Sequence, residues 1–152
     1  SLVAIDCGAV SADHLEASNE KEIAALANSE TIATVLPGAS LGLGMHFAPA
    51  RKLLDAGCCV AIASDWNPGS APQGDLLMQA AILGTYQKLS SAETFAGITF
   101  RAAQAFRLQN VGTINSGMKA DLQGYPTNDY REILYHQGKL KPIKVWIDGN
   151  LV

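Results

Sequence analysis

The sequence is poor in charged residues and has no long apolar run. Charged residues make up 16% of the 152 positions, and the formal net charge at pH 7 is −3. This balance provides no basic surface for nucleic acid or an anionic membrane. No apolar run approaches the ~20 residues that cross a bilayer, and no basic stretch precedes the first apolar segment. We therefore expect a cytoplasmic protein that acts on a small molecule, not on nucleic acid or a membrane.

Cysteine spacing and glycine spacing exclude two further classes of site. The three cysteines, Cys7, Cys58 and Cys59, have no CxxC spacing and lie in or beside apolar segments, which favours buried reduced thiols over a thiolate metal site. The glycines of residues 38–44 lack the GxGxxG and Walker spacings of phosphate-binding loops. The sequence therefore lacks the glycine fingerprint of a dinucleotide-binding α/β domain, which makes that class a weak alternative.

Apolar residues are abundant, at 48%, and their pattern predicts alternating strands and helices. Apolar runs without period-2 alternation at 31–36 and 58–63 are typical of strands buried on both faces of a parallel sheet. Residues 18–27 and 49–56 have the caps and spacing of helices between them. The apolar segment 2–7 leads to a first strand that ends near 11–15. The fold class is therefore α/β, with parallel strands and right-handed crossovers.

The second half of the sequence predicts two more helical regions and then a change of composition. Residues 75–84 are apolar nearly all round, and the Ser90-Ser91-Ala92-Glu93 capping box begins a helical region that reaches about Phe106. The loop at 39–47 is long and glycine-rich, which indicates mobility or close packing. From Val111 onward, Gly, Asn and Pro separate short strand-like runs such as 145–147. We place a domain boundary near residue 110.

Asp65 is the main candidate for chemistry, because it follows the buried strand 58–63 directly. Ligands of α/β folds gather outside the carboxyl ends of the strands, so a carboxylate there is a candidate metal ligand or general base. The alternative is an Asx-turn or a helix cap, for which Asp is also favoured. His14, near the end of the first strand, is a second candidate, with a core or turn histidine as the alternative.

Three strings of residues resemble the amidohydrolase superfamily, and within it the imidazolonepropionases. Ser64–Ser70 resembles the superfamily's last barrel strand, and the Ala-Asp-His-Leu string at 12–15 resembles its sixth. The tail at 125–138 closely resembles that of the imidazolonepropionases. The resemblance implies that Asp65 binds the metal and shares in handling the proton of the attacking water. It implies that His14 acts on the carbonyl side of the reaction. It also implies ligand contacts, made by Asn67, Gly69 and Ser70.

The resemblance also implies a fold and an activity. The expected fold is a partial (β/α) barrel over residues 1–110, formed by its last three βα units, followed by part of a small β-sandwich over 111–152. The family reaction is metal-dependent hydrolysis of the cyclic amide of 4-imidazolone-5-propanoate, which gives N-formimidoyl-L-glutamate in histidine degradation. In that family, zinc or iron activates the attacking water.

Most of the family's metal ligands are absent from the sequence, which has three His and no His-x-His pair. The family holds its metal through such a pair, a further His and the Asp, so we expect the 152-residue chain to retain no metal and to be inactive alone. The apolar start at Ser1 is typical of a chain joined part-way. Unpaired strand edges predict a homo-oligomer, or pairing with the missing N-terminal part. The alternative function is a non-catalytic truncated product that forms oligomers or binds a small ligand.

Overall fold

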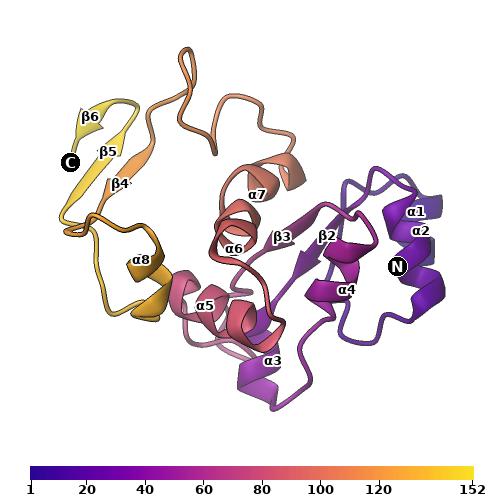
Figure 1. Cartoon of the computed structure of the whole chain (residues 1–152). Helices are drawn as coiled ribbons and strands as arrows, with labels where there is room; N and C mark the ends of the chain where they lie inside the picture. Colours follow the sequence, from indigo (N-terminus) through magenta and orange to yellow (C-terminus); the bar gives the residue numbers. More distant parts are fainter.

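The computed structural model describes residues 1–152, which form helices around two separate three-stranded sheets (Figure 1). The helices are α1 (Leu2–Asp6), α2 (Glu20–Ala27), α3 (Pro37–Leu43), α4 (Ala50–Asp55), α5 (Leu76–Tyr86), α6 (Ser91–Ile98), α7 (Phe100–Ala105) and α8 (Arg131–Tyr135). The strands are β1 (Ser11–Asp13), β2 (Ile32–Val35), β3 (Val60–Ile62), β4 (Leu122–Gly124), β5 (Lys144–Ile147) and β6 (Asn150–Leu151). None of the helices is both long and apolar enough to span a membrane.

The first sheet is parallel and lies at the centre of the core. Its order is β1-β2-β3, and its register aligns Asp13 with Thr34 and Thr34 with Ala61. All residues of β2 and β3 are buried, as their continuous apolar pattern predicts. Residues of α2, α4 and α5 join the strands in one hydrophobic cluster, which includes Leu26, Leu53 and Leu83. The predicted parallel strands and the α/β class are confirmed.

Two predicted helix starts are confirmed in detail. The Asn19 side chain accepts a hydrogen bond from the Glu22 N–H at 3.1 Å, and the Glu22 carboxylate accepts one from the Asn19 N–H at 3.0 Å. Ser90 and Glu93 form the same reciprocal pair at the start of α6. Each box satisfies two of the N–H groups that a helix leaves free at its N-terminus.

Two segments differ from their sequence-based predictions. Residues 2–6 are helical, because Ile5 packs on the core from a helical turn and Gly8, at φ +65°, ends that turn. The first strand is therefore only Ser11–Asp13, although its end lies where expected. Cys7 is exposed, not buried. The loop expected at 39–47 is in large part helix α3, with Pro37 in its first turn and Gly44 in the left-handed conformation at its end.

The second sheet is antiparallel, with the order β4-β5-β6. Leu122 pairs with Trp146, and β5 and β6 form a hairpin through Asp148 and Gly149, both at positive φ as a tight hairpin turn requires. The predicted strand at 145–147 is confirmed. The boundary near residue 110 and the assignment of this sheet to a β-sandwich stay predictions.

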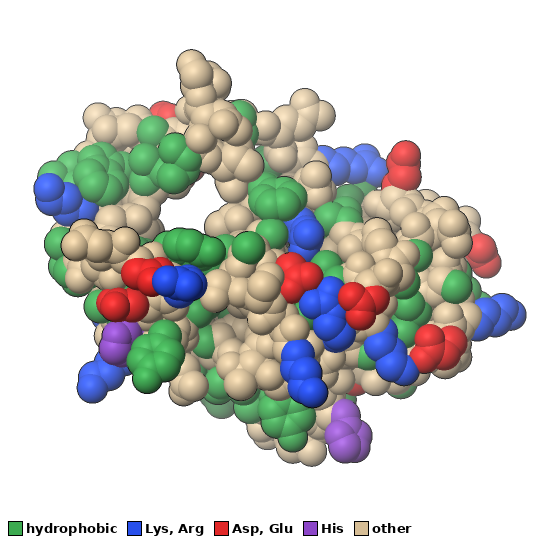
Figure 2. All heavy atoms as spheres, in the orientation of Figure 1, with side chains coloured by type: hydrophobic (Ala, Val, Ile, Leu, Met, Phe, Trp, Pro, Cys, Tyr) green, Lys and Arg blue, Asp and Glu red, His purple; other side chains and the backbone are tan.

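A cavity of about 1120 Å³ separates the antiparallel sheet from the helices beside it. Its walls come from α5, α6 and α7 on one side and from β4, β5 and residues 111–114 on the other, and most of the lining side chains are apolar. The space-filling view shows the corresponding opening, with apolar side chains gathered around the antiparallel sheet (Figure 2). Helix α8, which lies between β4 and β5 in the sequence, packs against α5.

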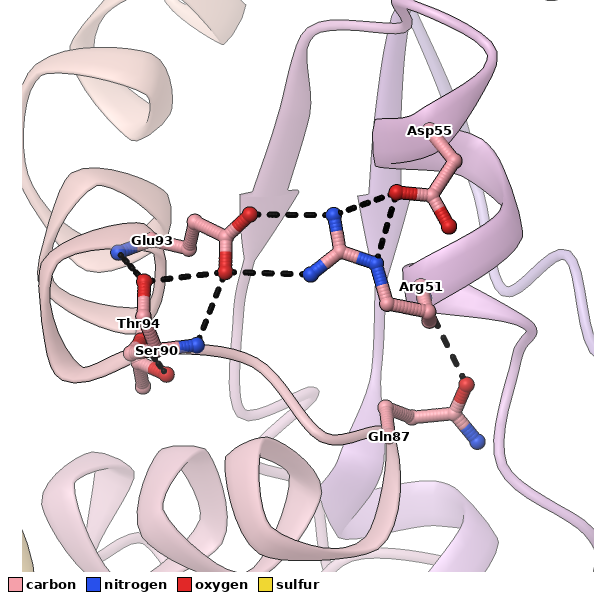
Figure 3. Close-up of polar contacts among 6 residues, drawn as sticks. All are labelled: Arg51, Asp55, Gln87, Ser90, Glu93 and Thr94. Carbon is pink, nitrogen blue, oxygen red and sulfur yellow. Dashed lines mark hydrogen bonds and ion pairs between the residues drawn. The ribbon is translucent and has the colours of Figure 1, made fainter.

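An ion-pair network ties α4 to α6 (Figure 3). The Arg51 guanidinium donates two hydrogen bonds to the Glu93 carboxylate, at 3.1 and 3.0 Å, and its Nε donates to Asp55 at 2.9 Å. Hydrogen bonds from Arg51 and from the Ser90 N–H lower the pKa of Glu93 to about 2. The bidentate geometry fixes the two helices, both of which contact β3, against each other.

Candidate active-site edge of the parallel sheet

The ends of β1 and β3 place His14 and Asp65 at the same edge of the parallel sheet. His14 follows β1 directly, and Asp65 lies three residues after β3. Carboxyl ends of parallel strands share one edge, and the intervening β2 separates the two outer strands by roughly 10 Å. Both residues have positive φ, 71° and 53°, which is uncommon outside glycine and marks sites of local backbone strain. The two predicted catalytic residues are therefore brought to one rim.

His14 is half-exposed and lies beside Glu16, a carboxylate that the sequence pattern does not single out. Its Nδ1 is 3.6 Å from Glu16 Oε1, and the same oxygen accepts a hydrogen bond from Ser40 Oγ at 3.3 Å. Ser40 is buried in α3, which directly follows β2. Glu16 thus links the end of β1 to the end of β2. The only sequence signal for it is a carboxylate two positions after the histidine.

Asp65 is half-buried, and its carboxylate has no hydrogen bond or ion pair with any other residue of the chain. Its backbone oxygen accepts a hydrogen bond from Asn67 Nδ2 at 2.6 Å, so the turn is held through the main chain. The carboxylate itself does not cap the turn that follows. The Asx-turn, the alternative for this position, is instead formed by its neighbour Asn67.

The three residues predicted to contact a ligand, Asn67, Gly69 and Ser70, lie together in the turn after Asp65. Asn67 Oδ1 accepts hydrogen bonds from the N–H groups of Gly69 and Ser70, both at 2.8 Å. Its Nδ2 also donates to Ser70 Oγ at 3.1 Å. These groups are therefore held at one place by each other, and their contact with a ligand stays a prediction.

Helix α3 packs closely on this turn, and two glycines permit it. A Cβ atom at Gly38 would collide with the Ser64 carbonyl oxygen, and one at Gly42 would collide with the Ser70 carbonyl oxygen. Only glycine allows the backbone to approach this closely. Of the two explanations offered for the glycine-rich segment, close packing at the rim is the one the structure supports.

No group of three or more His, Cys, Asp or Glu side chains in residues 1–152 lies close enough to hold a metal ion. Asp65 provides one carboxylate donor, whereas a catalytic metal takes about three protein ligands and keeps one open position. His46 is exposed after α3, and His136 packs edge-on against Tyr135. The residues of this chain therefore do not form a complete metal site by themselves.

The family model for the amidohydrolase family matches residues 3–152, and the chain belongs to this family. The chain is 42% identical over 147 residues to the imidazolonepropionase of Deinococcus radiodurans and 41% identical over 152 residues to that of Chloroflexus aggregans. These matches cover 97% and 99% of this chain but only 37% and 36% of the relatives. The chain thus spans little more than a third of their length. The resemblance to imidazolonepropionases found in the sequence is confirmed.

Solved structures of several enzymes have a similar fold, among them two with bound zinc. An adenosine deaminase from Xanthomonas campestris with bound zinc matches with a TM-score of 0.76 and 26% identity, covering 93% of this chain and 36% of that one. A mutant of the atrazine chlorohydrolase from Arthrobacter aurescens, complexed with zinc and atraton, matches with a TM-score of 0.75 and 19% identity, covering 93% of this chain and 35% of that one. The second match shows the fold alone.

Proposed function

We propose that this chain forms part of an imidazolonepropionase. Residues 1–110 would contribute the last three βα units of its (β/α) barrel, and 111–152 part of its β-sandwich. The reaction is hydrolysis of the cyclic amide of 4-imidazolone-5-propanoate to N-formimidoyl-L-glutamate. The observation that carries the proposal is the position of His14 and Asp65 at the same sheet edge in a chain about 40% identical to imidazolonepropionases.

The chain's own residues have distinct parts in this proposal. Asp65 has a carboxylate without a partner in the chain, so it is available to accept a proton from the water that attacks the ring carbonyl. His14, which lies beside Glu16, acts on the carbonyl side as a general acid or base. Asn67, Gly69 and Ser70 provide amide and hydroxyl groups that orient the substrate.

The metal of the proposed enzyme, zinc or iron, would take Asp65 as one ligand and its other ligands from residues outside this chain. We therefore expect the 152-residue chain to retain far less than one metal ion per molecule after dialysis, as measured by elemental analysis. Stoichiometric retained metal would show that the chain completes a site by itself, and would contradict this division of ligands.

The proposal is tested in a longer protein in which this chain follows the remaining two thirds present in its relatives. Asp65→Asn removes the charge and the proton acceptor while it keeps the side-chain size, so turnover should fall by about 10² or more. His14→Ala should lower turnover by a similar factor, and Asn67→Ala by about fivefold, the value of one neutral hydrogen bond. Asp6→Asn, at the exposed end of α1, is the matched control and should keep the parental rate. Near-parental turnover of Asp65→Asn would disprove the proposed centre.

A second candidate function, a non-catalytic module that forms oligomers, is favoured by one observation. Large apolar side chains are exposed around the antiparallel sheet and its cavity, among them Phe106, Ile114 and Ile147. Surfaces of this kind commonly mark contact with another chain. Sedimentation of the 152-residue chain at several concentrations should show association into a homo-oligomer. Addition of the N-terminal part should dissociate this oligomer. A monomer at every concentration would exclude the oligomer-forming module.

A further inference from the structure

The C-terminal segment, residues 125–141, contacts the start of α5 immediately after the rim loop, residues 65–74. Lys141 Nζ donates a hydrogen bond to Asp75 Oδ2 at 2.6 Å across 66 positions of sequence. Gly138, at φ +81°, lies so close to the same carboxylate that a Cβ atom there would be 2.6 Å from both oxygens. The α8 helix of this segment also packs against α5. Lys141 and Gly138 thus join the C-terminal segment to the Asp75 carboxylate at the start of α5, and α8 adds a contact with the same helix.

Asp75 connects this contact to the rim loop. Its carboxylate caps α5 by accepting a hydrogen bond from the Met78 N–H at 3.0 Å, and its own N–H donates to the Gln73 side chain. Gln79, fully buried one turn further along α5, donates its amide to the Gln73 carbonyl oxygen. The end of the rim loop is therefore fixed to α5 at Gln73 from two directions.

Gln79 also extends the connection to the beginning of the rim loop. Its side-chain amide lies against Gly38, and Gly38 in turn lies against the Ser64 carbonyl oxygen, one residue before Asp65. A displacement of the start of α5 therefore reaches both ends of the loop that carries the candidate ligand contacts. Within the loop, the Trp66 side chain donates a hydrogen bond to the Pro72 carbonyl oxygen at 3.2 Å, and from outside, Gly42 of α3 lies against the Ser70 carbonyl oxygen.

The charge of Asp75 agrees with this arrangement. Burial raises the pKa of its carboxyl, but hydrogen bonds from Lys141 and the Met78 N–H outweigh this effect and hold the pKa below its ordinary value. Asp75 is thus ionised at neutral pH and remains paired with Lys141. Burial, together with the nearby Asp75 charge, raises the pKa of Tyr125 at the other end of the segment.

We propose that Lys141 is a positioning residue for the rim loop: by holding Asp75, it fixes Asn67, Gly69 and Ser70 for substrate. The effect on catalysis rests on the proposed function, whereas the effect on the loop does not. Lys141 touches none of the candidate ligand contacts and acts only through Asp75, Gln73 and the start of α5.

The first test measures amide hydrogen exchange in the 152-residue chain, without any activity. In Lys141→Ala, protection of the Gly69 and Ser70 amides should fall about two- to fivefold, as expected from the loss of a partly exposed ion pair, while amides of α2 keep theirs. Asp75→Asn retains a capping oxygen but not the charge, and should give the same loss, with no further loss in the double variant. Lys141→Arg should restore protection. Lys139→Ala is the matched control, because it removes an exposed lysine from the same segment.

The second test uses the longer protein and steady-state kinetics. Lys141→Ala should raise KM about two- to fivefold and leave kcat within twofold, because the loop contacts move while Asp65 remains at the end of β3. Unchanged protection in Lys141→Ala, or equal loss in Lys139→Ala and in α2, would overturn the inference. Lower protection with parental KM would also overturn it, since the loop would then not act on substrate. If the parental longer protein shows no turnover, the proposed function is refuted, and hydrogen exchange alone then tests whether Lys141 holds the rim loop.

Discussion

The two sheets of this chain differ in how completely the chain covers them. Every residue of β2 and β3 is buried, whereas no residue of β4, β5 or β6 is. The parallel sheet has helices of its own packed around it, while the antiparallel sheet borders a large apolar cavity. Buried apolar area is the main source of stability, so stability should be concentrated around the parallel sheet, beside the rim that carries His14 and Asp65.

The largest expected effect tests this concentration directly. Leu53→Ala removes a fully buried side chain of α4 from the central cluster and should lower the free energy of unfolding by about 2–5 kcal/mol. Ile147→Ala removes a similar apolar side chain from β5, where that side chain is exposed. This variant should change the free energy of unfolding by less than about 0.5 kcal/mol. Urea denaturation followed by circular dichroism measures both. Similar losses in the two variants would mean that the antiparallel sheet is equally well packed.

The second prediction compares two carboxyls whose pKa values are both about 2. In Glu93 the cause is Arg51, which lies 42 positions away on another helix; in Asp129 it is Arg131, two positions away. Because folding lowers both pKa values, each contribution is present above the ordinary pKa, 4.5 for Glu93 and 3.8 for Asp129, and is lost as the pH falls toward 2. Glu93→Gln should therefore cost about 1 kcal/mol at pH 7, after allowance for solvent screening, and flatten the acid part of the stability curve.

Asp129→Asn should have a smaller effect, because its ion pair lies within one exposed turn and joins no separate elements. Urea denaturation of both variants between pH 2 and pH 7 makes the comparison. A larger loss for Asp129→Asn would show that a local pair in the antiparallel region stabilises the chain more than the connection between α4 and α6.

The sequence predicted the parallel region well because its signals are local. Capping boxes at Asn19 and Ser90 depend on residues three positions apart, and strands buried on both faces have continuous apolar runs. Helix α3 was missed for the opposite reason. Its glycines lower helix propensity, and the reason for their presence is contact with the Ser64 and Ser70 carbonyl oxygens of a distant turn.

The candidate site divides in the same way. His14 and Asp65 could be selected because each follows a strand, and parallel strands bring their ends to one edge. Glu16 and Lys141 could not, because their importance comes from contacts with Ser40 and Asp75 that depend on the folded arrangement. The contact between Lys141 and Asp75 spans 66 positions, so a pattern within a short stretch of sequence cannot predict it.

The smallest expected effect concerns exposed ion pairs, where the two regions should not differ. Lys52 pairs with Glu20 at 2.6 Å beside the parallel sheet, and Lys119 pairs with Asp121 at 3.2 Å beside the antiparallel one. Exposed pairs gain little, since water and salt screen them and the side chains lose freedom. Asp121 also accepts a hydrogen bond from the Asp148 N–H at 2.7 Å, which the loss of Lys119 leaves intact. Lys52→Ala and Lys119→Ala should therefore leave the urea midpoint unchanged within experimental error. A shift in Lys119→Ala alone would mean that surface charge, and not only buried apolar area, distinguishes the two regions.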